Sequence, residues 1–96
     1  MTALYAGNTL LGTLALEHMD HPGIYCRFEP TAEFEAFRRI MDLEGREISF
    51  QEHRAALEEL DLRIVFDSGR VTKLSMIVIR GDRAMYRMGF IRGIGV

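Results

Sequence analysis

The sequence predicts an α+β fold in which two helices pack on one face of a mainly antiparallel sheet. Residues 71–90 read as two strands joined by Gly81-Asp82, a pair that favours hairpin turns. Residues 3–19 contain a second hairpin around Gly7-Asn8. Residues 31–60 carry apolar side chains at helical spacing. The expected order of elements along the chain is therefore β-β-β-α-α-β-β-β.

The remaining strands are expected on either side of the helical region. Residues 24–29 alternate apolar and polar side chains as a third strand, and residues 62–66 alternate in the same way as a fourth. Pro22-Gly23 precedes the first of these strands, and Ser68-Gly69 follows the second. Both pairs are typical of turns, so they mark where these strands begin and end.

The first helix is expected to begin after an N-cap at Thr31 and to end near Met41. Glu35 and Arg39 are four residues apart, a spacing that favours an ion pair on a helix surface. The side chains expected to face the core are Phe34, Phe37, Ile40 and Met41.

The second helix is indicated by Ser49 and Glu52, which match the capping-box motif. It is expected to run to about Leu60 and to bury Phe50, Leu57 and Leu60. Its last turn carries three acidic residues, Glu58, Glu59 and Asp61. Because the helix dipole disfavours negative charge at this end, we expect basic groups nearby to offset them.

Length and composition indicate one domain over residues 1–90, followed by a flexible C-terminal tail over residues 91–96. The single cysteine, Cys26, excludes an internal disulfide and suits a reducing cytoplasm. The apolar run at residues 10–16 has no basic segment before it and is interrupted by Gly12. A signal peptide or a membrane span is therefore not expected.

The formal net charge of −2 conceals an uneven distribution. Residues 1–69 carry six arginines against thirteen acidic side chains, whereas residues 70–96 carry six basic side chains against Asp82 alone. Such an asymmetry bears on the partners that a protein attracts. The acidic total argues against nucleic acid as a partner.

Several segments resemble a group of small bacterial proteins of uncharacterised function. These are Phe28-Glu29-Pro30-Thr31 with Phe34, Asp20 with Pro22, and residues 79–84, Ile-Arg-Gly-Asp-Arg-Ala. Members of the group carry a D-x-P-W turn, an F-E-P-T-x-x-F junction and an I-x-G-D-x-A-W-F-R hairpin. This chain departs at Gly23, where the group has Trp, and at Met85-Tyr86, where it has Trp-Phe, but Arg87 keeps the arginine. The resemblance implies a bacterial cytoplasmic α+β protein and no particular activity.

Candidate catalytic and metal-binding residues are few. His18, Asp20 and His21 are metal-ligand types, but their spacing is not diagnostic, so an ordinary polar turn and a metal site both remain open. Cys26 lies in an alternating strand and is expected to be a buried, unreactive thiol. His53 is expected to be a half-buried helix residue rather than a base. We therefore predict no catalytic residue, metal or cofactor, and an enzyme is not indicated.

The C-terminal hairpin supplies the candidate binding surface. Pairing its strands around the turn sets Ser75 opposite Met88 and Ile77 opposite Tyr86, and it places Leu74 on the same face as Met76. The residues of this face predicted to bind a partner or an anion are Met76, Val78, Arg80, Arg83, Met85 and Arg87. Met and Arg are favoured in interface cores. An amphipathic surface covered by arginine stems is the alternative interpretation of the same pattern.

The functional prediction is a non-enzymatic protein-interaction or regulatory module of the cytoplasm. The alternative is a small enzyme or binding protein that recognises a phosphate or carboxylate through the basic hairpin face. Two helices cannot cover both faces of the predicted sheet, and an uncovered apolar face favours self-association. We therefore expect a homodimer, or a complex with another protein, in which acidic residues such as Glu58, Glu59 and Asp61 answer the arginines.

Overall fold

The computed structural model describes residues 1–45 and 47–88, so the predicted domain boundary at residue 90 and the tail over residues 91–96 lie outside the described residues. The strands are β1 (Thr2–Ala6), β2 (Thr9–Asp20), β3 (Gly23–Pro30), β4 (Leu62–Val65), β5 (Val71–Arg80) and β6 (Arg83–Met88). The helical segments are the 3₁₀ helices η1 (Ala32–Phe37) and η2 (Leu43–Gly45) and the α-helices α1 (Arg38–Met41) and α2 (Phe50–Glu59).

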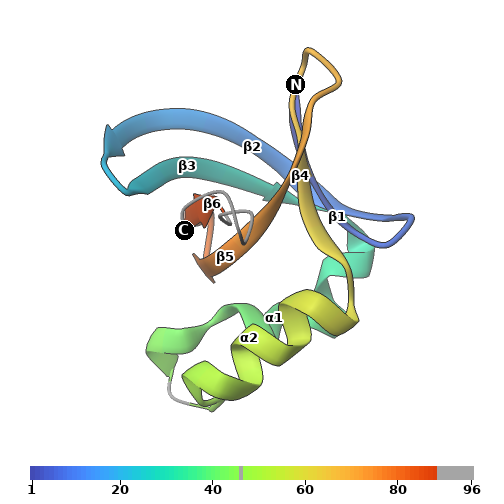
Figure 1. Ribbon diagram of the computed structural model, residues 1–96, viewed down its shortest axis with the longest axis vertical. Helices are drawn as coiled ribbons and strands as arrows, with labels where there is room; N and C mark the ends of the chain where they lie inside the picture. Colours follow the sequence, from blue (N-terminus) through green and yellow to red (C-terminus); the bar gives the residue numbers. More distant parts are fainter. Residues whose placement is uncertain (46, 89–96) are drawn as a thin grey trace, which may run out of the picture.

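The described strands form an antiparallel sheet that closes into a barrel in the order β1-β2-β3-β6-β5-β4 (Figure 1). The predicted α+β class, with two helices and antiparallel strands, is confirmed. The order of elements along the chain is also as predicted, but the sheet is closed rather than open, and the order of its strands in space departs from their order in the chain, since β6 lies between β3 and β5. Closure arises because β3 pairs with β6 and β1 pairs with β4, for example Leu4 with Ile64. A closed sheet buries its inner face inside the barrel, so only its outer face can meet water or another part of the chain.

Three irregularities help the described strands to bend into a barrel. The pairing register shifts between Leu4 and Tyr5 on β1, between Leu16 and His18 on β2, and between Leu74 and Met76 on β5. Bulges of this kind increase the local twist and bend a strand. The barrel interior is apolar and includes the fully buried Leu4, Phe28, Ile64, Ile77 and Ile79.

The helical layer lies at one end of the barrel, between the end of β3 and the start of β4 (Figure 1). Phe34 on η1 is completely buried, and its ring meets that of Phe28 edge-on with centroids 4.8 Å apart. Buried apolar side chains from the barrel and from the helical layer therefore form one core.

The first predicted helix, residues 31–41, is 3₁₀ over η1 and α-helical only over the four residues of α1. Thr31 precedes η1, but its hydroxyl does not cap it. The hydroxyl donates instead to the carbonyls of Leu10 (2.7 Å) and Leu11 (3.2 Å) on β2. The predicted Glu35–Arg39 pair is replaced by Glu35–Arg38 at 2.7 Å. A 3₁₀ helix has three residues per turn, so residues i and i+3 face each other.

The capping box of α2 is confirmed. The Glu52 N–H donates to Ser49 Oγ (3.1 Å), and the Ser49 N–H donates to Glu52 Oε1 (3.3 Å). Leu57 is buried and Leu60 is half-buried, but the prediction for Phe50 is wrong, because this side chain is 51% exposed. Ile48, which precedes the cap, is buried in its place. The helix begins after Ser49 as predicted, and Phe50, its first residue, lies outside the core.

His53 connects the helical layer to the barrel. Its Nδ1 lies 2.6 Å from the carbonyl oxygen of Ile40 at the end of α1, and its Nε2 accepts the N–H of Ile77 on β5 at 3.2 Å. The ring is fully buried rather than half-buried as expected, and it is the one buried polar side chain of the described residues. These contacts require a neutral imidazole with the proton on Nδ1, because Nε2 must accept.

Burial lowers the pKa of His53 below that of a free histidine, and the charge of Arg54 lowers it further, while the hydrogen bond to Ile40 opposes both. Protonation would destroy the acceptor for the Ile77 N–H and place a charge in the core. His53 is thus a structural link between layers and not an available base.

Gly12 on β2 has no side chain, which leaves room for the Phe28 ring and the β3 backbone to lie close to β2. A Cβ at this position would lie 2.4 Å from the Phe28 ring and 2.6 Å from the carbonyl oxygen of Glu29. No larger residue fits without displacing an aromatic ring that contacts the helical layer.

We predict that Gly12→Ala lowers the free energy of unfolding by about 1–3 kcal/mol, because overpacking displaces the Phe28 ring or the β3 backbone. Chemical denaturation followed by circular dichroism measures this change. Gly81→Asn is the control, because Gly81 lies in a turn at φ +61° with no atom within 4 Å of the point that a Cβ would occupy, and Asn tolerates positive φ. Equal stability of wild type and Gly12→Ala would contradict the tight approach.

A second prediction concerns pH. Because the pKa of His53 is lower in the folded protein than in the unfolded chain, the unfolded chain takes up the proton first, and stability rises with pH. The stability that the neutral His53 contributes to the fold is fully present above the pKa of histidine in the unfolded chain, about 6.5, and is lost as the pH falls below that value.

His53→Gln can keep both hydrogen bonds, since an amide offers a donor and an acceptor, but it does not titrate. We expect its unfolding free energy to fall less steeply than that of wild type between pH 7 and pH 5, measured by urea denaturation. His18 and His21 are present in both proteins and cancel in the comparison. Parallel pH profiles would contradict the role assigned to His53.

Candidate functional site

The six residues of the predicted binding face all lie on the outer side of the β5–β6 hairpin. Met76 pairs with Arg87, Val78 with Met85, and Arg80 with Arg83, while the alternate pairs, Ile77 with Tyr86 and Ile79 with Ala84, point into the barrel. The turn at Gly81-Asp82 has a positive φ at Gly81 only, as in a type II′ turn. This turn sets the register on which the whole face depends.

Two details of the predicted register are wrong. The register shifts at Ser75, so Leu74 rather than Ser75 pairs with Met88. The extra residue moves Leu74 to the inner side, where it is buried in the core instead of sharing a face with Met76. The Ser75 hydroxyl donates to the carbonyls of Arg87 and Met88, both at 3.3 Å, and so satisfies backbone groups at the bulge.

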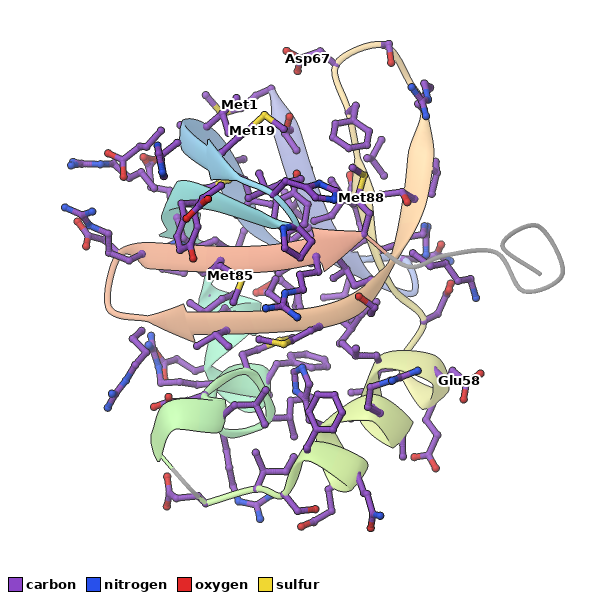
Figure 2. All side chains as sticks on the ribbon, turned by 60° about the vertical axis from the view of Figure 1, so that its left-hand side comes forward. Met1, Met19, Glu58, Asp67, Met85 and Met88 are labelled. Carbon is purple, nitrogen blue, oxygen red and sulfur yellow. The ribbon has the colours of Figure 1, made fainter. Side chains whose placement is uncertain are left out.

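A cavity of about 370 Å³ lies against this face. Five of the six predicted residues line it, and Arg87 does not. Tyr25 from β3 and Leu43 from η2 complete its apolar wall, and Glu17 from β2 lies at its edge. Val78 points away from the barrel yet is only 9% exposed. Figure 2 shows Met85 on the β5–β6 hairpin, with the helical layer beneath β5.

A second hollow, of about 570 Å³, continues from the first toward α2. The two share Leu43 and Met76. The second is otherwise lined by residues that lead into or begin α2: Glu47, Ile48, Ser49, Phe50 and Glu52. We call the two hollows together the groove. It runs between the outer face of the β5–β6 hairpin and the helical layer.

Carboxylates within the same chain already face two of the groove arginines. Glu17 lies 3.4 Å from Arg83 and 3.7 Å from Arg27, and Asp42 lies 3.2 Å from Arg80. Among the described residues Arg87 has no ion-pair partner. An anion entering the groove would therefore compete with two fixed carboxylates, while an apolar side chain would not.

Asp61 also differs from its expected role. It adopts φ +52° after the end of α2, and its carboxylate pairs with Arg63 (2.7 Å) and Lys73 (3.6 Å). The carboxylate of Asp61 is thus offset by basic groups of the same chain, one of them on the C-terminal hairpin. Asp61 is not left to answer arginines of a partner.

The remaining chemical candidates are a buried thiol, a buried phenol and an exposed turn. Burial, and secondarily the charge of Glu17, raises the pKa of Cys26 to about 11, so the thiol stays protonated at neutral pH, as expected of a buried cysteine. Burial, and secondarily Cys26, raises the pKa of Tyr86 to about 12. His18, Asp20 and His21 are exposed around the β2–β3 turn. The described part of the chain contains no cluster of three or more side chains that could hold a metal ion.

Sequence reasoning missed the residues that other elements add to the groove: Glu17, Tyr25, Leu43, Asp42 and Phe50. Hairpin register identifies neighbours within one pair of strands, but β3 and η2 reach this face only through barrel closure and the fold of the helical layer. Of these residues, only Phe50 could have been singled out from the sequence, because it is an aromatic residue at the first position of a helix whose cap the sequence predicts.

Several exposed apolar side chains lie outside the lining of the groove: Met1, Leu16, Met19, Val71 and Met88. Figure 2 shows Met1 and Met19 on the side of the barrel away from the helical layer, which we call the open end. These residues lie away from the groove. Their exposure makes them suitable controls for the exposed apolar residues in it.

No helix in the described ranges is both long enough and apolar enough to cross a bilayer. Comparison with protein-family models, with curated proteins and with solved structures found no significant match to this chain.

Proposed function

We propose that the protein is a non-enzymatic protein-interaction module, that the groove is its contact surface, and that its partner is a second copy of the chain. The observation that carries the proposal is the gathering of Met76, Val78 and Met85 around one cavity at the protein surface. Methionine side chains adapt to irregular partners, and Met and Arg are enriched in interface cores. The resemblance to small bacterial proteins adds a bacterial cytoplasmic setting.

Charge favours a protein partner over a small anion. Arg80 and Arg83 each lie beside a carboxylate of the same chain, so a phosphate would have to displace Asp42 or Glu17. An apolar side chain can enter the cavity while these pairs stay intact at its rim. Rim pairs contribute little affinity but exclude wrongly charged partners.

We predict that the protein is a dimer in solution and that Met76→Glu converts it to a folded monomer. Met76 is half-buried on the outer face, so a charge there desolvates on association but stays hydrated in the monomer. Light scattering coupled to size-exclusion chromatography measures the mass, and circular dichroism checks the fold.

Met19→Glu is the matched control, because it places the same charge on an exposed methionine at the open end of the barrel and should leave the dimer intact. A wild-type mass equal to the 11.0 kDa chain at high micromolar concentration and low salt would refute the proposal.

The alternative function is recognition of a phosphate or carboxylate. Arg87 supports it, since this exposed guanidinium has no ion-pair partner among the described residues. We expect phosphate and citrate at millimolar concentration to leave the melting temperature unchanged, as measured by thermal shift. A saturable rise that Arg87→Ala abolishes would favour the alternative.

A further inference from the structure

The start of α2 lies on the barrel with little apolar contact to hold it there. We call residues 48–54 the α2 start, and the structure describes all of them. Within it only Ile48 and His53 are buried, and every other side chain is exposed. Ile48 lies outside the apolar core and lines the groove together with Met76. The first residue of the helix that belongs to the core is Leu57, one turn after His53. The rest of α2 is therefore anchored, but its start is not.

One polar contact joins the α2 start to the barrel. Among the hydrogen bonds of the described residues, it is the one from the Ile77 N–H to Nε2 of His53, at 3.2 Å. At Ile77 no described strand pairs with β5 on the side away from β6. The imidazole nitrogen thus takes the place that the carbonyl of a neighbouring strand would hold in a sheet. This acceptor exists only while the ring is neutral.

The helices around His53 offer no counter-charge for a protonated ring. On α2, Arg54 is itself positive, and the carboxylate of Glu52 is held in the capping box. On α1, Arg38 and Arg39 are positive as well. Burial first, and then the charge of Arg54, hold the pKa of His53 below its ordinary value.

The barrel side of the ring offers no counter-charge either. On β5, Lys73 and Arg80 are positive, and the carboxylate of Asp42, which follows α1, pairs with Arg80 at 3.2 Å. On β6, burial raises the pKa of Tyr86 to about 12, so the phenol is neutral. Within the described residues no carboxylate pairs with the ring of His53. A proton on this ring is therefore unfavourable while the α2 start lies on β5, and it becomes favourable once the ring meets water.

We propose that the α2 start is a pH-sensitive flap, which separates from β5 when Nε2 of His53 binds a proton from the solvent, while the barrel stays closed. With this proton Nε2 becomes a donor, and the Ile77 N–H loses its acceptor. The pairing of β1 with β4 and the contact of Phe34 with Phe28 lie elsewhere, so they survive the opening.

The flap goes beyond the proposed function and does not rest on it, because it concerns one copy of the chain. It also differs from a loss of overall stability at low pH, since only one segment separates. Opening would move Ile48 and Phe50 away from Met76 and so dismantle the second hollow of the groove. Whatever the groove binds, its shape would then depend on pH.

Hydrogen exchange of the Ile77 amide, followed by nuclear magnetic resonance from pH 7.5 to pH 5, tests the flap. At each pH the intrinsic exchange rate divided by the measured rate gives a protection factor. We expect a lower protection factor for Ile77 than for the amides that pair β1 with β4, because a local opening costs less than global unfolding. Below about pH 6.5, the ordinary pKa of histidine, the factor for Ile77 should fall by up to about tenfold per pH unit, since the open state binds one more proton.

Two variants separate the proton from the packing. His53→Gln keeps a donor and an acceptor but does not titrate, so the protection factor of Ile77 should no longer depend on pH over this range. Ile48→Ala is the matched variant, because it removes the other buried side chain of the flap and leaves the imidazole in place. It should lower the protection factor of Ile77 at every pH and keep its pH dependence. Circular dichroism checks that both variants fold.

Two results in the wild type would overturn the flap. If Ile77 is protected as strongly as the amides between β1 and β4, with the same pH dependence, the α2 start separates only when the whole protein unfolds. If Ile77 is weakly protected but equally so at pH 7.5 and pH 5, the segment opens without any control by His53. Neither readout depends on the mass of the protein in solution, so the flap and the proposed dimer stand or fall separately.

Discussion

The neutral imidazole of His53 holds the helical layer against the barrel, and the groove depends on that contact. One wall of the groove is the outer face of β5, and the other is formed by η2 and the start of α2. His53 accepts from Ile77 on β5 and contacts the Ile40 carbonyl at the end of α1, so one side chain joins both walls. A buried ring with both nitrogens satisfied fixes the two layers in one relative position.

The hydrogen bond to Ile77 also serves the barrel. β4 pairs with residues 71–73 of β5, and among residues 1–45 and 47–88 no strand pairs with the second half of β5 on the side away from β6. The helical layer covers this edge, and His53 supplies an acceptor to it. Covering an edge with a helix is a common protection against unwanted strand pairing. It leaves the outer face of β5 and β6 beside a helix, and a groove forms where the two meet.

Local chemistry made much of the fold predictable. Both glycine-containing hairpin turns, the capping box at Ser49 and the burial of Cys26 depend on residues close together in the chain, and they are confirmed. Barrel closure was not predictable, because it requires β1 to pair with β4, from Ala3 to Val65, and no periodicity within a strand reports a pairing at that separation. The bulge at Ser75 was not predicted for a related reason. The alternation of apolar and polar side chains assigns faces correctly only where the register is unbroken.

In the candidate site, too, the features set by nearby residues were predictable and those set by distant segments were not. The register of one hairpin placed all six predicted residues on one face, and five of them line the cavity. The walls contributed by Tyr25 and Leu43 come from distant segments. Closure also removes part of the reason for expecting self-association, because the inner face of the sheet is buried within the barrel and needs no second copy to cover it. What remains is a local apolar cavity beside an exposed aromatic residue, a smaller and more specific reason for the proposed contact.

The methionines test most directly whether the groove is where two copies meet. They occupy distinct places: Met76 and Met85 line the groove, Met41 lies in the core, Met1 and Met19 lie at the open end, and Met88 is exposed outside the groove. With ¹³C-labelled methionine methyl groups, nuclear magnetic resonance spectra recorded over a dilution series report all of them in one experiment. We predict concentration-dependent shifts for Met76 and Met85 and none for Met19 and Met88. Shifts confined to the open-end methionines, or no concentration dependence at all, would contradict it.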